Sequence, residues 1–182
     1  MRLDDIIRKR RSIRSFTDEQ VSAGHMSSLI EAGLRAPSSM GHNPWHFVVL
    51  TEKSLLAELA SAKPHGGSFL KEAPLAIAVC ADPSKSDVWV EDASIAAVFI
   101  QLTAESLGLG SCWVQLRNRM HDESKSAGRV AAEVLGIPEG LEVECIIAVG
   151  HPAERKPSRS REELLWSRVY LNRHGNALYS EG

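Results

Sequence analysis

The sequence has little of what would identify several common classes of protein. Its three cysteines, Cys80, Cys112 and Cys145, are odd in number and widely spaced, so they form no disulfide framework. The 21 lysines and arginines nearly balance the 23 aspartates and glutamates, whereas a general nucleic-acid binder needs a basic excess on one face. No apolar run approaches the roughly 20 residues that cross a bilayer, and the start of the chain lacks the apolar segment of a signal peptide. We therefore expect a cytoplasmic protein that binds neither nucleic acid nor membrane.

Familiar metal-binding and phosphate-binding patterns are also missing. His42 and His46 are four residues apart, but Pro44 between them breaks the helix that would put both on one face, so we predict no metal site. Cys112, beside Trp113, is the one thiol near a candidate site, and its apolar neighbours favour packing over a role as nucleophile. There is no G-x-G-x-x-G or Walker sequence. A bound phosphate would therefore have to be held by side chains.

What the sequence does contain is a basic cluster near each end. Residues 8–14 read RKRRSIR, and residues 155–161 read RKPSRSR after an apolar run that stops at Gly150. Either cluster alone would more often be a solvated face than a binding site. Strand ends and loops are where α/β folds gather ligand groups, and arginine, lysine and hydroxyl donors suit a phosphate. Together the clusters indicate an anion between them.

Periodicity and capping signals predict one α/β (α+β) domain that spans residues 1–182. Helices are expected from Asp4 as cap to about Arg10, from Ser22 as cap to about Arg35, and over residues 52–62, 88–107, 124–135 and 162–169. Strands are expected over residues 46–51, 75–81, 111–116 and 143–149. No segment rich in proline, glycine or serine divides the chain into two domains.

The long helix expected over residues 88–107 is apolar on more than one face, so it must be buried on more than one side. Either it lies at the centre of the monomer, or part of it meets a second copy in a homodimer. The pattern by itself leaves both alternatives open.

Five segments, taken in order, resemble the nitroreductase-like family of flavoproteins. They are residues 10–14 (RRSIR), 36–50 (APSSMGHNPWHFVVL), 71–74 (KEAP), 107–113 (LGLGSCW) and 149–152 (VGHP). The resemblance covers nearly the whole chain. It implies a nitroreductase-like fold with a central, mostly antiparallel sheet flanked by helices, in an intertwined homodimer that binds FMN at the subunit interface.

The resemblance also implies a phosphate site and a separate role for Arg14. By position in the family's motifs, the residues that would hold the phosphate of FMN are Arg10, Ser12, Lys156 and Arg159, with Arg11 assisting. Arg8 and Lys9 are expected to be solvated. Arg14 could reach the pyrimidine edge of the flavin, where a cation stabilises the negative charge of the reduced ring. The alternative is a surface ion pair with Asp18 or Glu19.

Two further groups of flavin contacts follow from the same resemblance. The other subunit would contribute Pro37, Ser38, Ser39 and Asn43. Asn43 departs from the family pattern, which frequently has a glutamine there, and its side chain is shorter. Leu109 and Gly110 would bring backbone close to the reactive N5 edge of the flavin.

The activity that the resemblance implies is that of an FMN-dependent NAD(P)H oxidoreductase with a ping-pong mechanism. NADH or NADPH would give hydride to flavin N5 and leave, and a nitroaromatic, a quinone or a similar acceptor would follow. Because the chemistry lies on the flavin, we predict no catalytic side chain. The alternatives are a reductive dehalogenase or flavin-fragmenting enzyme of the same fold, decided by residues 65–69 or 82–90, and a non-catalytic flavin-binding module.

Overall fold

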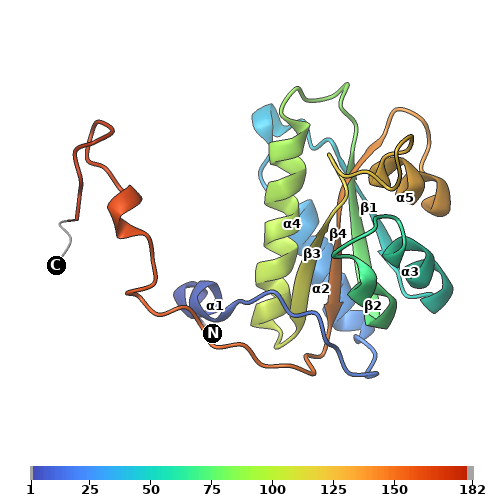
Figure 1. Cartoon of the computed structure of the whole chain (residues 1–182), viewed down its shortest axis with the longest axis horizontal. Helices are drawn as coiled ribbons and strands as arrows, with labels where there is room; N and C mark the ends of the chain where they lie inside the picture. The colour runs from blue at the N-terminus through green and yellow to red at the C-terminus, as the bar shows by residue number, and fades with distance from the viewer. Residues whose placement is uncertain (1, 180–182) are drawn as a thin grey trace.

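The computed structural model describes residues 2–179 and is built on a four-stranded antiparallel sheet (Figure 1). The strands are β1 (Trp45–Leu50), β2 (Leu75–Ala81), β3 (Gly110–Gln115) and β4 (Glu142–Gly150), in the order β1-β2-β4-β3. All three pairs of neighbouring strands are antiparallel. The sequence predicted each strand to within one residue at either end. The predicted α+β fold with an antiparallel sheet is therefore confirmed.

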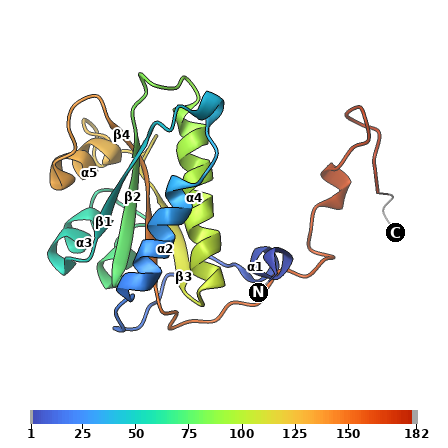
Figure 2. The ribbon, with the colours of Figure 1, turned by 180° about the vertical axis from the view of Figure 1, so that it is seen from behind.

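Helices cover both faces of the sheet (Figures 1 and 2). The α-helices are α1 (Leu3–Lys9), α2 (Ala23–Leu34), α3 (Lys53–Ala60), α4 (Trp89–Ser106) and α5 (Ala127–Leu135), and the 3₁₀ turns are η1 (Ser39–Gly41), η2 (Ser68–Glu72) and η3 (Trp166–Arg168). Helices α2 and α4 lie on one face, and α3 and α5 on the other. The predicted cap of α2 is confirmed, because the Ser22 hydroxyl accepts a hydrogen bond from the His25 amide at 3.1 Å.

Two helix starts differ from the prediction. Helix α1 begins after Arg2, so Asp4 lies in its first turn and favours the helix through its charge near the positive end of the dipole. Helix α5 begins after Ser126 instead of near Ser124. The Asp122 carboxylate accepts hydrogen bonds from the amides of Ser124 and Lys125, each at 2.8 Å, and this holds a turn before the helix.

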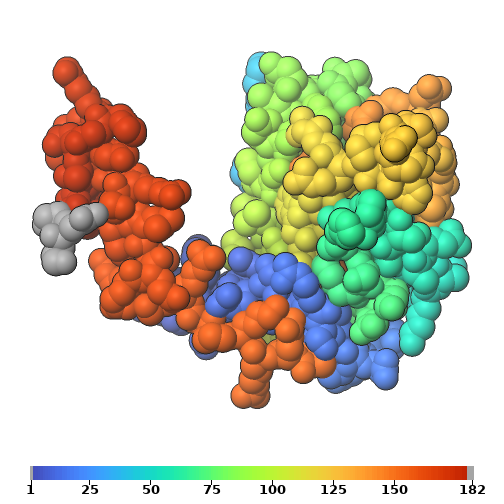
Figure 3. Space-filling view, in the orientation of Figure 1, coloured from blue at the N-terminus to red at the C-terminus, as the bar shows by residue number. Residues whose placement is uncertain are grey.

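The helix predicted over residues 162–169 is wrong, because only the single turn η3 forms there. It belongs to the C-terminal arm, residues 157–179, which leaves the body beside α1 (Figures 1 and 3). The leucines at 164 and 165 are 44% and 58% exposed. A short helix needs an apolar face packed on a core, and among residues 2–179 the arm packs on no core.

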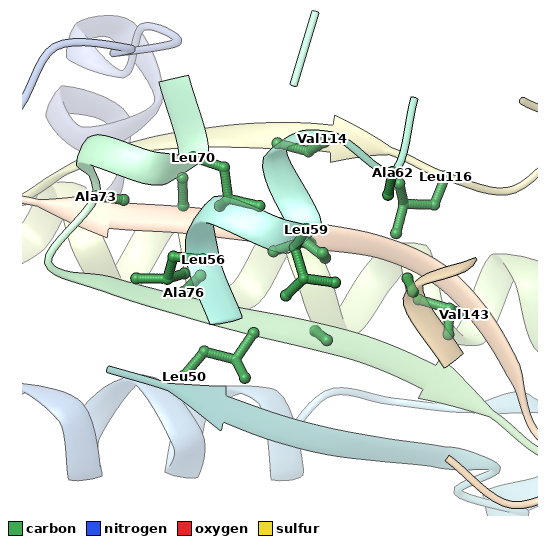
Figure 4. Close-up of a cluster of buried hydrophobic side chains, with 14 of the residues drawn as sticks. Leu50, Leu56, Leu59, Ala62, Leu70, Ala73, Ala76, Val114, Leu116 and Val143 are labelled. Carbon is green, nitrogen blue, oxygen red and sulfur yellow. The ribbon is translucent and has the colours of Figure 1, made fainter. Parts of the chain in front are cut away.

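A hydrophobic core lies on each face of the sheet. The core under α3 and α5 includes Leu56, Leu59 and Leu70, packed over Ala76 of β2 (Figure 4). The next residue of β2, Ile77, enters the opposite core under α2 and α4. Central strands covered on both faces explain why β2 and β4 read as continuous apolar runs.

Helix α4 is apolar on two sides, but the chain buries only one of them. Ala93, Ala97 and Ile100 pack on the sheet and are fully buried. On the other side Val98 and Phe99 are 45% and 38% exposed. The alternative of a helix enclosed within the monomer is therefore wrong.

Candidate functional site

The segment after α1 runs along the end of the sheet and brings the two basic clusters together. Ser12 forms a parallel bridge with Ser111 of β3, and the Ile13 amide donates to the Ser111 carbonyl at 3.0 Å. Four residues later, the Thr17 amide donates to the carbonyl of His151, just beyond β4, at 2.9 Å. Residues 10–14 therefore lie between β3 and the start of the second basic cluster.

A pocket of about 620 Å³ opens between these segments, and we call it the basic pocket. The residues that line it are Ile7, Arg8, Arg10, Arg11, Ser12, Arg14, Lys156, Arg159 and Leu164. It combines six cationic side chains with a hydroxyl, and none of the acidic residues between positions 2 and 179 lines it. Such donors suit a phosphate. All the residues predicted to surround a phosphate are thus brought together, and Arg8, expected in solvent, joins them.

Glu154 joins the two basic clusters beside this pocket. Its carboxylate accepts from the Arg14 amide at 2.6 Å and lies 3.1 Å from the Lys156 ammonium. Both hydrogen bonds lower the pKa of Glu154, and the bond from the Arg14 amide has the larger effect. Lys156 also donates to the Ser12 carbonyl at 2.8 Å. The Lys156 ammonium is therefore fixed at the wall of the pocket by an anion and a carbonyl.

Arg14 takes neither of the two acidic partners considered from the sequence. Among residues 2–179, its guanidinium forms no ion pair with Asp18 or Glu19. It lies 5.8 Å from the centre of the Phe69 ring, a cation–π distance. Arg14 is exposed and lines the basic pocket, so its charge faces the space where a ligand would lie.

Leu109 and Gly110, at the start of β3, lie next to residues 10–14. They line a neighbouring pocket of about 470 Å³ that shares Arg11 and Lys156 with the basic pocket. A Cβ atom at position 110 would lie 2.8 Å from the Ile13 side chain. Glycine is therefore needed for residues 10–14 to approach β3 this closely.

Pro37, Ser38, Ser39 and Asn43 lie outside the basic pocket of their own chain. They belong to the loop of residues 37–43, which we call the η1 loop and which lies near the N-terminal end of α4, where the Ser39 amide donates to Asp92 at 2.8 Å. The neighbouring pocket lies at the other end of α4, at Glu105 and Gly108. From Asp92 to Ser106 the helix advances about 21 Å at about 1.5 Å per residue. Within one chain, the two groups of predicted flavin contacts are therefore apart.

Asn43 bonds within its own loop. Its side-chain oxygen accepts a hydrogen bond from the Ser38 hydroxyl at 2.8 Å, and its backbone amide donates one to the same hydroxyl oxygen at 3.0 Å. The shorter side chain at this position thus closes the loop on itself.

Some residues of the site were not predicted from the sequence. Ile7 and Leu164 come from two separate segments, so no local signal marked them. Phe69 belongs to residues 65–69, which were expected to decide between reactions, but its contact with Arg14 was not predicted. Glu154 did carry a signal, since it is the one acid between Gly150 and the end of the second cluster. Cys112 is buried, and burial raises the pKa of its thiol while the charges of Arg14 and Lys156 oppose that shift.

Residues 2–179 contain no group of three or more histidine, cysteine or acidic side chains that could hold a metal ion. In the same part of the chain, no helix is both long and apolar enough to cross a membrane.

Known proteins resemble this chain over most of its length. The model of the Nitroreductase family matches residues 7–151. A protein of Archaeoglobus fulgidus with the provisional name NADH dehydrogenase/NAD(P)H nitroreductase is 38% identical over 83% of this chain and 86% of its own length. The FMN reductase [NAD(P)H] of Bacillus subtilis is 29% identical over 89% of this chain and 72% of its own.

A solved structure agrees with these sequence relatives. The FMN-dependent nitroreductase of Clostridium difficile superposes with a TM-score of 0.91 at 45% identity, over 92% of this chain and 98% of that one. The shared sequence, the shared fold and the match of the family model over residues 7–151 lead to one conclusion. The chain belongs to the Nitroreductase family.

Proposed function

We propose that the protein is an FMN-dependent oxidoreductase that takes reducing equivalents from NADH or NADPH. The observation that carries this is the basic pocket, where Arg10, Ser12 and Lys156 converge from segments some 140 residues apart in the chain. The names of the relatives, an FMN-dependent nitroreductase and an NAD(P)H-dependent FMN reductase, support the same cofactor and reductant.

The residues present fit a phosphate monoester such as that of FMN. A phosphate dianion needs several charge-assisted donors, and here they are side chains, since the chain has no glycine-rich phosphate loop. The proposed phosphate ligands are Arg10, Arg11, Ser12, Lys156 and Arg159. Glu154 holds Lys156 toward this side, so the ammonium is already oriented before the ligand arrives.

Arg14 is the residue that we assign to the ring of the cofactor. Its charge faces the basic pocket, and its guanidinium rests against Phe69. A cation at the pyrimidine edge stabilises a reduced, negatively charged ring more than the oxidised one, which raises the reduction potential. The backbone of Leu109 and Gly110, in the neighbouring pocket, is the other part of the chain that we assign to the ring.

We further propose that two chains form an intertwined homodimer, each acting as one flavin-binding domain over residues 1–182. Val98 and Phe99 of α4, with Leu3 and Ile7 of α1, leave large apolar side chains exposed in the single chain. The C-terminal arm extends away from the body (Figure 3). It presents further exposed apolar side chains, among them Leu165 and Leu171. A second copy would cover these surfaces, and its η1 loop would complete the site that one chain leaves open.

When bound, FMN would supply the redox chemistry, by hydride transfer from the nicotinamide and then to an oxidised acceptor in a ping-pong sequence. The chain's own contribution is to bind the cofactor, orient it and set the charge around it. Nitroaromatics and quinones are the acceptors that we propose. A cytoplasmic location remains a prediction.

The test is a visible spectrum of the purified protein after FMN is added and the excess removed, followed by anaerobic titration with NADH and with NADPH. We expect one FMN per chain and loss of the visible absorption band of the flavin on reduction. A yellow complex that neither nucleotide bleaches would indicate a flavin-binding module instead. Absence of a complex would reject the proposed cofactor.

A further inference from the structure

Asp92 is a buried carboxylate that touches the η1 loop. It lies near the start of α4 and is only 2% exposed. One carboxylate oxygen accepts from the Ser39 amide at 2.8 Å, and the other accepts from the Ser86 hydroxyl at 2.8 Å. Its place in the first turn of α4 would by itself be explained by the helix dipole, which favours an acidic residue there.

We propose that Asp92 is a positioning residue that holds the η1 loop in the conformation that contacts the flavin of the partner subunit. The inference rests on the proposed function, because it assigns a supporting residue to that site. Asp92 itself would not touch the cofactor. It would act through the backbone of Ser39.

The backbone of the η1 loop explains why such an anchor is needed. Met40, Gly41 and Asn43 have φ angles of 50°, 71° and 45°, in the left-handed region that non-glycine residues rarely adopt. Such a conformation persists only when surrounding contacts fix it. The bonds between Ser38 and Asn43 close the loop on itself. Asp92 supplies a link from this loop to α4.

The second carboxylate oxygen extends the anchor to residues 82–88. Ser86 is 5% exposed, and its hydroxyl is directed at Asp92. Pro44, the residue directly after the η1 loop, is joined to residues 82–88 as well, because its carbonyl accepts from the Asp82 amide at 2.9 Å. Asp92 therefore fixes the η1 loop relative to residues 82–88, part of the segment expected to decide between the reactions that this fold supports.

The surroundings of Asp92 argue against a general role in packing. An apolar cluster of Ala36, Trp45 and Ala96 lies in the same region of the fold. Among residues 2–179, no lysine, arginine or histidine forms an ion pair with Asp92. A buried carboxylate without a cation is costly, and an apolar side chain would avoid that cost. A carboxylate at this position is therefore accounted for by the Ser39 amide and the Ser86 hydroxyl, the two donors that it orients.

The first test compares the affinity for FMN of four proteins: the wild type, Asp92→Ala, Asp92→Asn, and Glu91→Gln as a matched control that removes one charge from the neighbouring exposed position. We expect Asp92→Ala to bind FMN about tenfold more weakly, the effect of losing a hydrogen bond to a charged group. Asp92→Asn keeps an oxygen for the Ser39 amide and should recover most of the affinity. Glu91→Gln should match the wild type.

The second test uses a heterodimer of one Asp92→Ala subunit and one Arg10→Ala subunit. If each η1 loop serves the partner's site, the intact loop of the Arg10→Ala subunit completes the intact basic pocket of the other subunit. One site per dimer should then bind FMN with wild-type affinity. If the loop served its own subunit, both sites would be defective.

Wild-type affinity in Asp92→Ala would overturn the inference while the proposed function stands. A heterodimer without a restored site would overturn both the inference and the proposed sharing of the site between subunits, while the proposed cofactor and reductant stand. A wild-type protein that does not bind FMN would overturn both. Asp92→Leu, which keeps the number and branching of the side-chain atoms but has no acceptor, replaces the alanine variant if the latter does not fold, and the same outcomes apply.

Discussion

Lys156 owes its place in the basic pocket to two oxygen atoms, one from the first basic cluster and one from the residue just before the second. The Ser12 carbonyl accepts from its ammonium at 2.8 Å, and Glu154 lies 3.1 Å away. Because these contacts hold the lysine before any ligand binds, little side-chain entropy remains to be lost on binding. At the scale of single residues, the affinity for a phosphate therefore depends on a few fixed donors.

Removal of one of these donors gives a direct prediction. Arg10→Ala and Lys156→Ala should each weaken FMN binding by about ten- to a hundredfold, because a hydrogen bond to a charged group contributes about 1.5–3 kcal/mol. Titration of flavin fluorescence would measure it. Arg129→Ala, which removes the same charge from α5, should leave the affinity unchanged. Unchanged affinity in both site variants would contradict the phosphate assignment.

The buried thiols predict how stability depends on pH. Burial raises the pKa of Cys80 to about 12 from an ordinary value of 9.0. Between these values the unfolded chain has released the thiol proton and the folded chain retains it. The free energy of unfolding should therefore fall as pH rises above about 9, by up to about 1.4 kcal/mol per pH unit for this thiol.

Urea denaturation from pH 8 to pH 10.5 would measure this fall. Cys80→Ala lacks the titrating group and should show a shallower decline than the wild type. Equal slopes in the two proteins would mean that Cys80 titrates normally in the folded chain. Cys145 is also buried with a raised pKa, so part of the decline should remain in the variant.

At the scale of elements, the site depends on how closely the segment after α1 can approach the sheet. Gly110 of β3 faces Gly150 of β4 in the sheet register. A Cβ atom at position 150 would lie 2.6 Å from the ring of Pro74, and one at position 110 would lie 2.8 Å from Ile13. Glycine at both strand ends thus allows the chain to pack over this edge of the sheet.

Gly110→Ala should therefore push residues 10–14 away from β3. We expect a loss of about 1–3 kcal/mol in the free energy of unfolding, as for other overpacked sites, and weaker binding of FMN. Gly24→Ala is the matched control, because its Cβ would lie 4.0 Å from the nearest atom, on an exposed helix. That variant should be neutral or slightly stabilising. Equal stability of both variants would refute the close approach.

At the scale of the whole molecule, the exposed face of α4 and the C-terminal arm are the features that a single chain leaves unexplained. Large apolar residues on both are between 37% and 58% exposed. The η1 loop and the basic pocket lie toward opposite ends of α4. One arrangement accounts for both facts, namely a second copy of the chain packed on α4.

A charge on this face should prevent that packing. Val98→Asp combined with Phe99→Asp should give a monomer by sedimentation velocity, where the wild type should sediment as a dimer. The variant should also lose FMN, because each proposed site needs the partner's η1 loop. Leu34→Asp, at another exposed apolar position, is the control and should remain dimeric. A monomeric variant with normal FMN affinity would exclude a site shared between subunits.

The sequence by itself determined the elements whose cause is local. Strands β1 to β4 were predicted to within one residue, because runs of apolar residues between polar segments need only their own neighbours to be recognised. The predicted phosphate ligands also came from short segments, residues 10–12 and 156–159. The two basic clusters together predicted a bound anion, and the family resemblance identified that anion as the phosphate of FMN.

Only the tertiary structure decided which distant residues meet. Glu154 contacts Arg14 across 140 positions of sequence, and Asp92 contacts Ser39 across 53. The helix expected over residues 162–169 failed for the same reason, since a helical pattern forms a helix only where a core receives its apolar face. Local pattern specifies what a segment can become, and contacts between distant segments select what it does become.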